Sequence, residues 1–139
     1  MEITAVALQE VAENQNVLFT DTVIYGNPSI VHRAGSGLIT ARGLTNQCRA
    51  RFKATFGGNI AIPTGGTVGE ISLAISLDGE PLASTIMIET PAAVEQFSNV
   101  FSAVYFTVPA GCCATIGVRN TSDQAISVQN ANLIVERVA

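Results

Sequence analysis

His32 is the residue on which any acid–base or nucleophilic chemistry would have to rest, because it is the single histidine in the chain. A Ser-His-Asp or Cys-His arrangement needs a nucleophile within hydrogen-bond reach of that imidazole. Nothing in the sequence places one there, since His32 lies in a short predicted strand near a turn, on the opposite face to Val31 and Arg33. We interpret it as a half-exposed structural histidine, and we predict no catalytic residue and no enzymatic activity.

The three cysteines, Cys48, Cys112 and Cys113, show neither the even number of a disulfide scaffold nor the C-x-x-C spacing of a zinc or redox site. A metal site built from His and Cys would need almost every such residue in the chain to converge. We therefore predict no zinc site and no cofactor, and we expect buried cysteines that act as small hydrophobic residues. At most one of Cys112 and Cys113 should reach the core, because adjacent strand residues point to opposite faces. Pairing of Cys48 with either of them is left open.

Carboxylates offer the remaining route to chemistry. Asp78 and Glu80 flank Gly79, and glycoside hydrolysis requires a pair of carboxylates. The same residues fit solvated positions of a turn, which is the interpretation we favour. A calcium site would need a denser run of Asp and Asn than any loop of this chain contains. The segment 64–69 (TGGTVG) lacks the Gly-Lys-Ser/Thr of a phosphate-binding loop, so it is predicted to be a turn.

The composition favours a protein that covers part of its surface with other subunits. Only 13% of its 139 residues are charged and 47% are hydrophobic, against about 25% charged residues in an average soluble domain. Such an apolar surplus in a short chain indicates a homo-oligomer. The net charge of −4 argues against nucleic-acid binding, which depends on clustered Lys and Arg. No run approaches the roughly 20 apolar residues of a membrane helix, so we expect no membrane insertion.

Short strands, not helices, should position the functional residues. Gly, Pro, Asn and Thr interrupt the chain about every ten residues, and no long i, i+3, i+4 apolar stripe is present. In 48–56, apolar residues alternate with Arg49, Arg51 and Lys53, which predicts one apolar and one basic face. In 71–77, Ile and Leu alternate with Ser and Ala, and Asp78-Gly79 follows as a hairpin-turn signal. The next strand should begin at 81 or 82 and end near 88.

The most apolar strand is expected over 99–108. Both of its alternating sets are apolar or aromatic, as in a strand buried on both sides, and a neighbouring subunit would explain that. Turn signals at 109–111 and 120–123 enclose a strand over 112–118, and a last strand should run from 125 or 126 to 138. In the first half, shorter strands are expected over 3–8, 16–19, 30–33 and 38–41.

Eight to ten short strands at this spacing predict an all-β, antiparallel sandwich of jelly-roll type. It would occupy residues 1–139 as a single domain, with 1–10 as a short N-terminal strand or arm. Two glycine-rich segments, 57–59 and 64–69, flank the apolar residues 60–62. We predict that both segments are exposed binding loops at one end of the sandwich. The loop residues predicted to bind are Gly57, Gly58, Asn59, Thr64, Gly65 and Gly66.

The order of several segments points to a known family. An early strand at 15–19 (QNVLF) is followed by 29–33 (SIVHR), a turn at 35–37 and a strand at 38–40. Later come the strand at 49–56, the apolar strand 72–79 (SLAISLDG), the turn 108–111 (VPAG) and the closing strand 131–137 (ANLIVER). Over residues 11–139 this pattern resembles the trimeric jelly rolls of the complement-type globular head and tumour necrosis factor superfamily, particularly bacterial and phage versions.

The resemblance implies a homotrimer whose threefold axis is lined by apolar and aromatic strand residues. We predict that the apolar stretch 97–108 supplies this lining. The predicted interface residues are Phe97, Val100, Phe101, Val104, Tyr105, Phe106 and Val108.

The leading hypothesis is a structural protein of a bacteriophage virion, a homotrimer that decorates the capsid or tips a fibre. Its partners would be copies of itself and capsid or tail proteins. The alternative is the head of a bacterial cell-surface or spore-coat protein that binds a glycan or protein. A third hypothesis, an enzyme acting on carbohydrates through Asp78 or Glu80, would place function in the hairpin turn.

Overall fold

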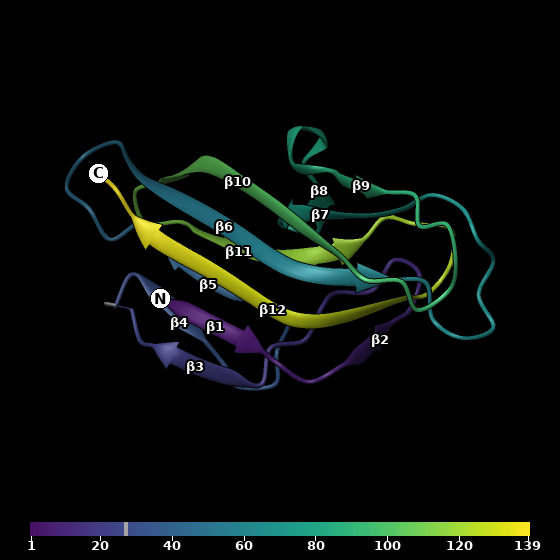
Figure 1. Ribbon diagram of the computed structural model, residues 1–139. Coiled ribbons are helices and arrows are strands. Elements are labelled where there is room, and N and C mark those ends of the chain that lie inside the picture. Colours follow the sequence, from purple (N-terminus) through teal and green to yellow (C-terminus); the bar gives the residue numbers. More distant parts are fainter. Residues whose placement is uncertain (27) are drawn as a thin grey trace.

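The computed structural model describes residues 1–26 and 28–139, and it arranges them as two antiparallel, six-stranded sheets packed face to face (Figure 1). The first sheet has the order β10-β6-β12-β1-β3, with β2 also paired to β12. Its strands are β10 (Ser98–Pro109), β6 (Arg49–Ala61), β12 (Ile126–Arg137), β1 (Glu2–Ala5), β3 (Asp21–Ile24) and β2 (Gln9–Val11). The fold prediction, an all-β antiparallel sandwich, is confirmed.

The second sheet has the order β4-β5-β11-β7-β8, with β9 also paired to β7. Its strands are β4 (Ile30–His32), β5 (Ile39–Arg42), β11 (Cys113–Asn120), β7 (Ile71–Leu77), β8 (Glu80–Pro81) and β9 (Met87–Glu89). The described residues contain no α-helix, and a single 3-10 turn, Ala83–Thr85, lies between β8 and β9. The strand predicted from 81 or 82 to 88 is therefore wrong as one element, because that turn divides it.

The space between the sheets is filled by one apolar cluster to which nearly every strand contributes. The alternation in β6 was predicted correctly: Ala50, Phe52, Ala54 and Phe56 are fully buried while the residues between them face outward. Phe52 stacks on Phe106 of β10, with ring centroids 5.5 Å apart and planes inclined by 13°. Such offset aromatic pairs add specific contact energy to the burial of their area.

Local turn chemistry fixes the hairpin between β7 and β8. Asp78 and Gly79 both have positive φ, 52° and 86°, as the mirror-image turns that join antiparallel strands require. Leu77 consequently pairs with Glu80, and the predicted turn is confirmed. β7 itself departs from the predicted alternation, because its first six residues are all buried.

Gly57, Gly58 and Asn59 do not form the predicted loop; they continue β6 to Ala61 and pair with β10 and β12. A Cβ at Gly58 would come within 3.3 Å of the Cα of Ala131, so the glycine admits the close approach of β12. At this point β12 is irregular, since its register with β6 shifts between Gln129 and Asn132. The glycines thus mark a bulge and not a turn.

The N-terminal third was predicted least well. Residues 16–19 form no strand and contribute only an isolated bridge from Asn16 to Arg119, while β2 and β3 were not anticipated. Residues 1–10 are integrated into the first sheet, since β1 pairs with β12 and β3, and β2 with β12. The described chain therefore has twelve strands, more than the eight to ten expected.

Candidate functional site

The outer face of the first sheet, the side turned away from the second sheet, carries two of the three aromatic residues of β10. Phe101 and Tyr105 are 65% and 62% exposed, and Ala103 lies between them on the same side. Because β10 ends the order of the sheet, this group lies at an edge. We call these three residues the β10 patch.

Part of the predicted subunit interface is wrong. Val100, Phe106 and Val108 alternate with the β10 patch, point to the other side of the strand and belong to the core of the subunit. Val104 packs against that core as well. Phe97 precedes the strand and is exposed. The prediction that both alternating sets of β10 residues are apolar is correct. The second sheet covers one of these sets, and only the other is exposed.

A continuous row of residues crosses the outer face from one edge to the other. Residues paired across neighbouring strands share a face, so the register carries Ala103 through Thr55, Ile134 and Glu2 to Ile24. Along the row only Glu2 carries a charge, and its carboxylate accepts a hydrogen bond from the amide of Asn132 at 3.2 Å. Figure 1 shows the five strands of this row side by side. The row links the two edges of the sheet by an almost uncharged path.

The opposite edge, at β3, carries a second exposed apolar group. Val23 and Ile24 are exposed, and the neighbouring Tyr25 is 78% exposed. We call these residues the β3 patch. Ile24 lies on the outer face through its pairing with Glu2, so this face carries exposed apolar residues at both of its edges, where an ordinary monomer would scatter such residues singly.

Charged groups lie along one side of this row on the outer face, and amide groups lie along the other side. The ammonium of Lys53 lies 5.7 Å from the ring centre of Tyr105, and Lys53 is paired in register with Glu136. On the other side, amide side chains bond across three strands: Asn99 donates to Asn59 at 3.2 Å and Asn59 donates to Asn130 at 3.3 Å. The face thus has an apolar middle and a polar rim, which is the usual anatomy of a protein interface.

The amino group of Met1 is fixed beside this face. It donates a 2.7 Å hydrogen bond to the carbonyl of Val135, and the Val135 amide donates back to the Met1 carbonyl at 2.9 Å. Partial burial lowers the pKa of this amino group below its usual value, against the opposing influence of Glu136 and Glu2. The contact ties the start of β1 to β12.

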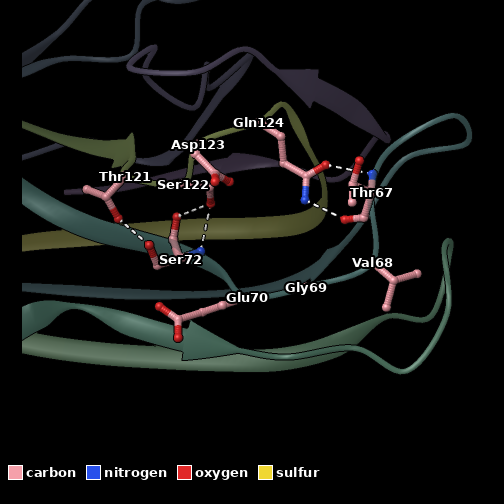
Figure 2. A pocket seen from close by; sticks show the side chains of 9 residues that line it. All are labelled: Thr67, Val68, Gly69, Glu70, Ser72, Thr121, Ser122, Asp123 and Gln124. Atoms are coloured by element: carbon pink, nitrogen blue, oxygen red, sulfur yellow. Dashed lines mark hydrogen bonds between the residues drawn. The ribbon is translucent and has the colours of Figure 1, made fainter.

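A polar pocket lies between the β6–β7 and β11–β12 connections (Figure 2). These connections are at the end of the sandwich opposite the two chain ends (Figure 1). We call it the end pocket; its volume is about 530 Å³. Its lining residues are Thr67, Val68, Gly69, Glu70, Ser72, Thr121, Ser122, Asp123 and Gln124. Thr67, Val68 and Gly69 belong to the glycine-rich segment 64–69, which the sequence indicated as an exposed loop. The other lining residues were not identified from the sequence, because the second connection lies about fifty positions further along the chain and matches no motif.

The predicted loop residues Thr64, Gly65 and Gly66 lie next to this pocket and not within it. They line an adjacent hollow of about 370 Å³, together with Pro63 and Gln124 among others. The hydroxyl of Thr64 donates to the carboxylate of Glu95 at 2.5 Å, which holds this connection against the segment before β10. Gly65 has φ +90°, so the tip of the loop uses the freedom of glycine.

Asn120 holds the end pocket in shape from behind. Its side chain is fully buried, and its amide nitrogen donates to the carbonyls of Val11, Ala12 and Gln124 at 3.0, 3.3 and 2.9 Å. Its amide oxygen accepts the backbone N–H of Ser122 at 2.9 Å. Both N–H groups of the amide are used, with three carbonyls sharing the two of them, and its oxygen accepts one bond, so the start of the β11–β12 connection is held firmly in place.

The cysteines are exposed, so the prediction that they are buried is wrong. All three lie at the other end of the sandwich: Cys48 directly precedes β6, and the turn at Gly111 leads from β10 to Cys112 and Cys113. The Cys48 carbonyl accepts the amide of Ala110 at 3.0 Å, which brings the two connections together. All three thiols are free. Cys48 and Cys112 lie in connections, and Cys113, the first residue of β11, points to the face opposite the buried Ala114.

His32 is half-buried and engaged in structural contacts, as predicted. Its two ring nitrogens lie 3.1 Å from the hydroxyl of Thr22 and 3.0 Å from the carbonyl of Ser36. Asp78 also has a structural partner, because its carboxylate accepts the amide of Thr115 at 2.9 Å and so ties the β7–β8 turn to β11. Neither residue lines the end pocket.

Within residues 1–26 and 28–139, no group of three or more His, Cys, Asp or Glu side chains is arranged to hold a metal ion. The same residues include no helix of the length and apolar character needed to cross a bilayer.

Comparison with known proteins identifies the fold. No family model and no curated protein sequence matches the chain. Among solved structures, the globular domain of zebrafish complement 1qA protein is similar with a TM-score of 0.63 and 12% identity, over 96% of this chain and 93% of that one. Murine APRIL is similar with a TM-score of 0.60 and 10% identity, over 95% and 96% of the two chains. The chain has the jelly-roll fold of these two structures. Identities this low establish the jelly-roll fold alone, and they do not identify the partners of this chain.

Proposed function

We propose that this jelly roll is a non-enzymatic assembly protein that works as a homotrimer, with the outer face of the first sheet as its subunit interface. The observation that carries the proposal is the presence of exposed apolar residues at the two opposite edges of the first sheet, with Phe101, Tyr105 and Ile24 on its outer face. A cyclic ring needs two different, complementary patches on each subunit, whereas a twofold dimer needs one self-complementary patch. The β10 patch of one subunit would pack against the β3 patch of the next.

Three further features support assembly over catalysis. The two similar structures have the same jelly-roll fold, which the family resemblance associates with trimers. The chain is poor in charge for its size. His32 and Asp78, the residues to which chemistry would be assigned first, are engaged in structural hydrogen bonds.

Analytical ultracentrifugation tests the trimer directly. The expected result at micromolar concentration is a single species with about three times the 14.5 kDa subunit mass. A stable monomer over the same range would contradict the proposal, and a dimer would replace the ring with a twofold interface.

We further propose that the trimer is a component of a bacteriophage virion. There it would decorate the capsid or form the tip of a fibre, and it would contact capsid or tail proteins. The support is the apolar assembly face together with the resemblance of the sequence pattern to trimeric jelly rolls, phage versions among them. Mass spectrometry of density-purified phage particles from the host that carries the gene should detect peptides of this chain at a constant ratio to the major capsid protein. Their absence from particles, with the protein found on the cell or spore surface, would favour the alternative of a surface-protein head that binds a glycan or protein.

A further inference from the structure

The end pocket contains two carboxylates that the protein does not use. Among the described residues, neither Glu70 nor Asp123 has a hydrogen-bond or ion-pair partner, and both side chains are exposed. Figure 2 shows Asp123 beside Ser122 on one wall and Glu70 at the start of β7 on the facing wall. No Lys or Arg is among the lining residues. The pocket therefore offers strong acceptors and repels anionic ligands.

The walls that carry these carboxylates are preformed. The hydroxyls of Ser72 and Thr121 lie 2.6 Å apart, and the Ser72 amide donates to the hydroxyl of Ser122 at 2.7 Å. At the mouth, Gln124 accepts the Thr67 amide at 3.0 Å and donates to the Thr67 carbonyl at 2.7 Å (Figure 2). A pocket held by its own hydrogen bonds loses little conformational entropy when it binds a ligand.

We infer that the end pocket binds a neutral saccharide unit through its hydroxyl groups. Glu70 and Asp123 would each accept hydrogen bonds from ligand hydroxyls, and the hydroxyls of Ser72 and Thr121 have donor and acceptor capacity left for the ligand. The exposed side chain of Val68 provides an apolar contact for the C–H groups of a sugar ring. The volume of about 530 Å³ lies within the range of small-molecule sites, about 300–1,000 Å³.

The site stands apart from the proposed trimer interface. Its residues come from the β6–β7 and β11–β12 connections and the start of β7, a strand of the second sheet. The outer face of the first sheet can therefore be covered while the pocket stays open. Because the pocket lies within one subunit, a result that refutes ligand binding would not refute the trimer, and a result that refutes the trimer would not refute ligand binding.

Amide-detected NMR titration of the intact protein tests the inference. The probes are the methyl glycosides of glucose, galactose, mannose and fucose, each added to about 50 mM, well above a Kd in the millimolar range. At least one glycoside should shift the amides of Thr67, Gly69, Ser72 and residues 121–124 along a saturable curve. Calcium chloride is titrated separately, because a cation is the other occupant that carboxylates attract.

Matched variants assign the shifts to the carboxylates. Asp123→Ala and Glu70→Ala should each weaken glycoside binding about tenfold, which is the loss expected for a hydrogen bond to a charged group. Glu80→Ala removes an exposed carboxylate at the far end of β7 and should leave binding unchanged. The inference is overturned if no glycoside gives saturable shifts at these amides, if Glu80→Ala weakens binding as much as Asp123→Ala, or if only calcium perturbs the pocket.

Discussion

Replacing Phe101 with serine should dissociate the trimer without unfolding the subunit. Phe101 is 65% exposed in the isolated subunit, so covering it removes about 130 Å² of apolar surface, taking roughly 200 Å² for a whole Phe. At about 25 cal/mol per Å² this amounts to about 3 kcal/mol per subunit, or about 10 kcal/mol for three copies in a closed ring. The equilibrium constant for dissociation into three subunits should then rise by about seven powers of ten.

Sedimentation equilibrium over a dilution series measures this change, and circular dichroism checks that the variant subunit is folded. Because Phe101 points away from the core, its replacement should change the unfolding free energy of the subunit by no more than about 0.5 kcal/mol. The matched control is Ile88→Ser, which removes another exposed apolar side chain but from β9 of the second sheet. A Phe101→Ser protein that stays trimeric across the dilution series would refute the interface, as would equal dissociation of the control.

Three other measurements follow from the structure. Phe52→Ala should lower the unfolding free energy by about 3–5 kcal/mol in urea denaturation, because it opens a cavity in the middle of the core; a loss below 1 kcal/mol would mean that the stacked pair there is wrong. Asn120→Ala should cost about 3 kcal/mol or more by the same assay, since three backbone carbonyls and one amide lose their partner, and it should broaden the NMR signals of the end pocket. A thiol-reactive disulfide reagent should modify all three cysteines of the native protein at the rate of the unfolded chain; a slow third thiol would show that one is buried.

The elements that the sequence predicted well are those with a strong local pattern. Residues 71–77 and the Asp78-Gly79 turn coincide with β7 and its hairpin, because the apolar alternation and the positive-φ turn residues are both local signals. The failures at Gly57 and Gly58 have the opposite origin. A glycine pair serves equally well in a turn and in a strand that another backbone approaches closely, and only the bulge in β12 decides between them.

The candidate sites divide in the same way. The sequence showed that both faces of residues 99–108 are apolar, but it could not show which face the second sheet would cover. That choice left Phe101 and Tyr105 exposed and placed Val100, Phe106 and Val108 in the core. The sequence could not predict the end pocket for a related reason, because the pairing of β7 with β11 is what brings Glu70 and Asp123 to facing walls of the same pocket.

By itself, the sequence determined the all-β class, the longer strands, the tight turns and the surplus of apolar surface, since these depend on residue type and period-2 spacing within a few positions. Only the tertiary structure decided which apolar set is the core, which edges carry the exposed patches, and which distant loops share a pocket. Those properties arise from pairing between strands that are far apart in the chain, such as β1 and β12. The local sequence pattern of a strand does not specify which distant strand it will pair with.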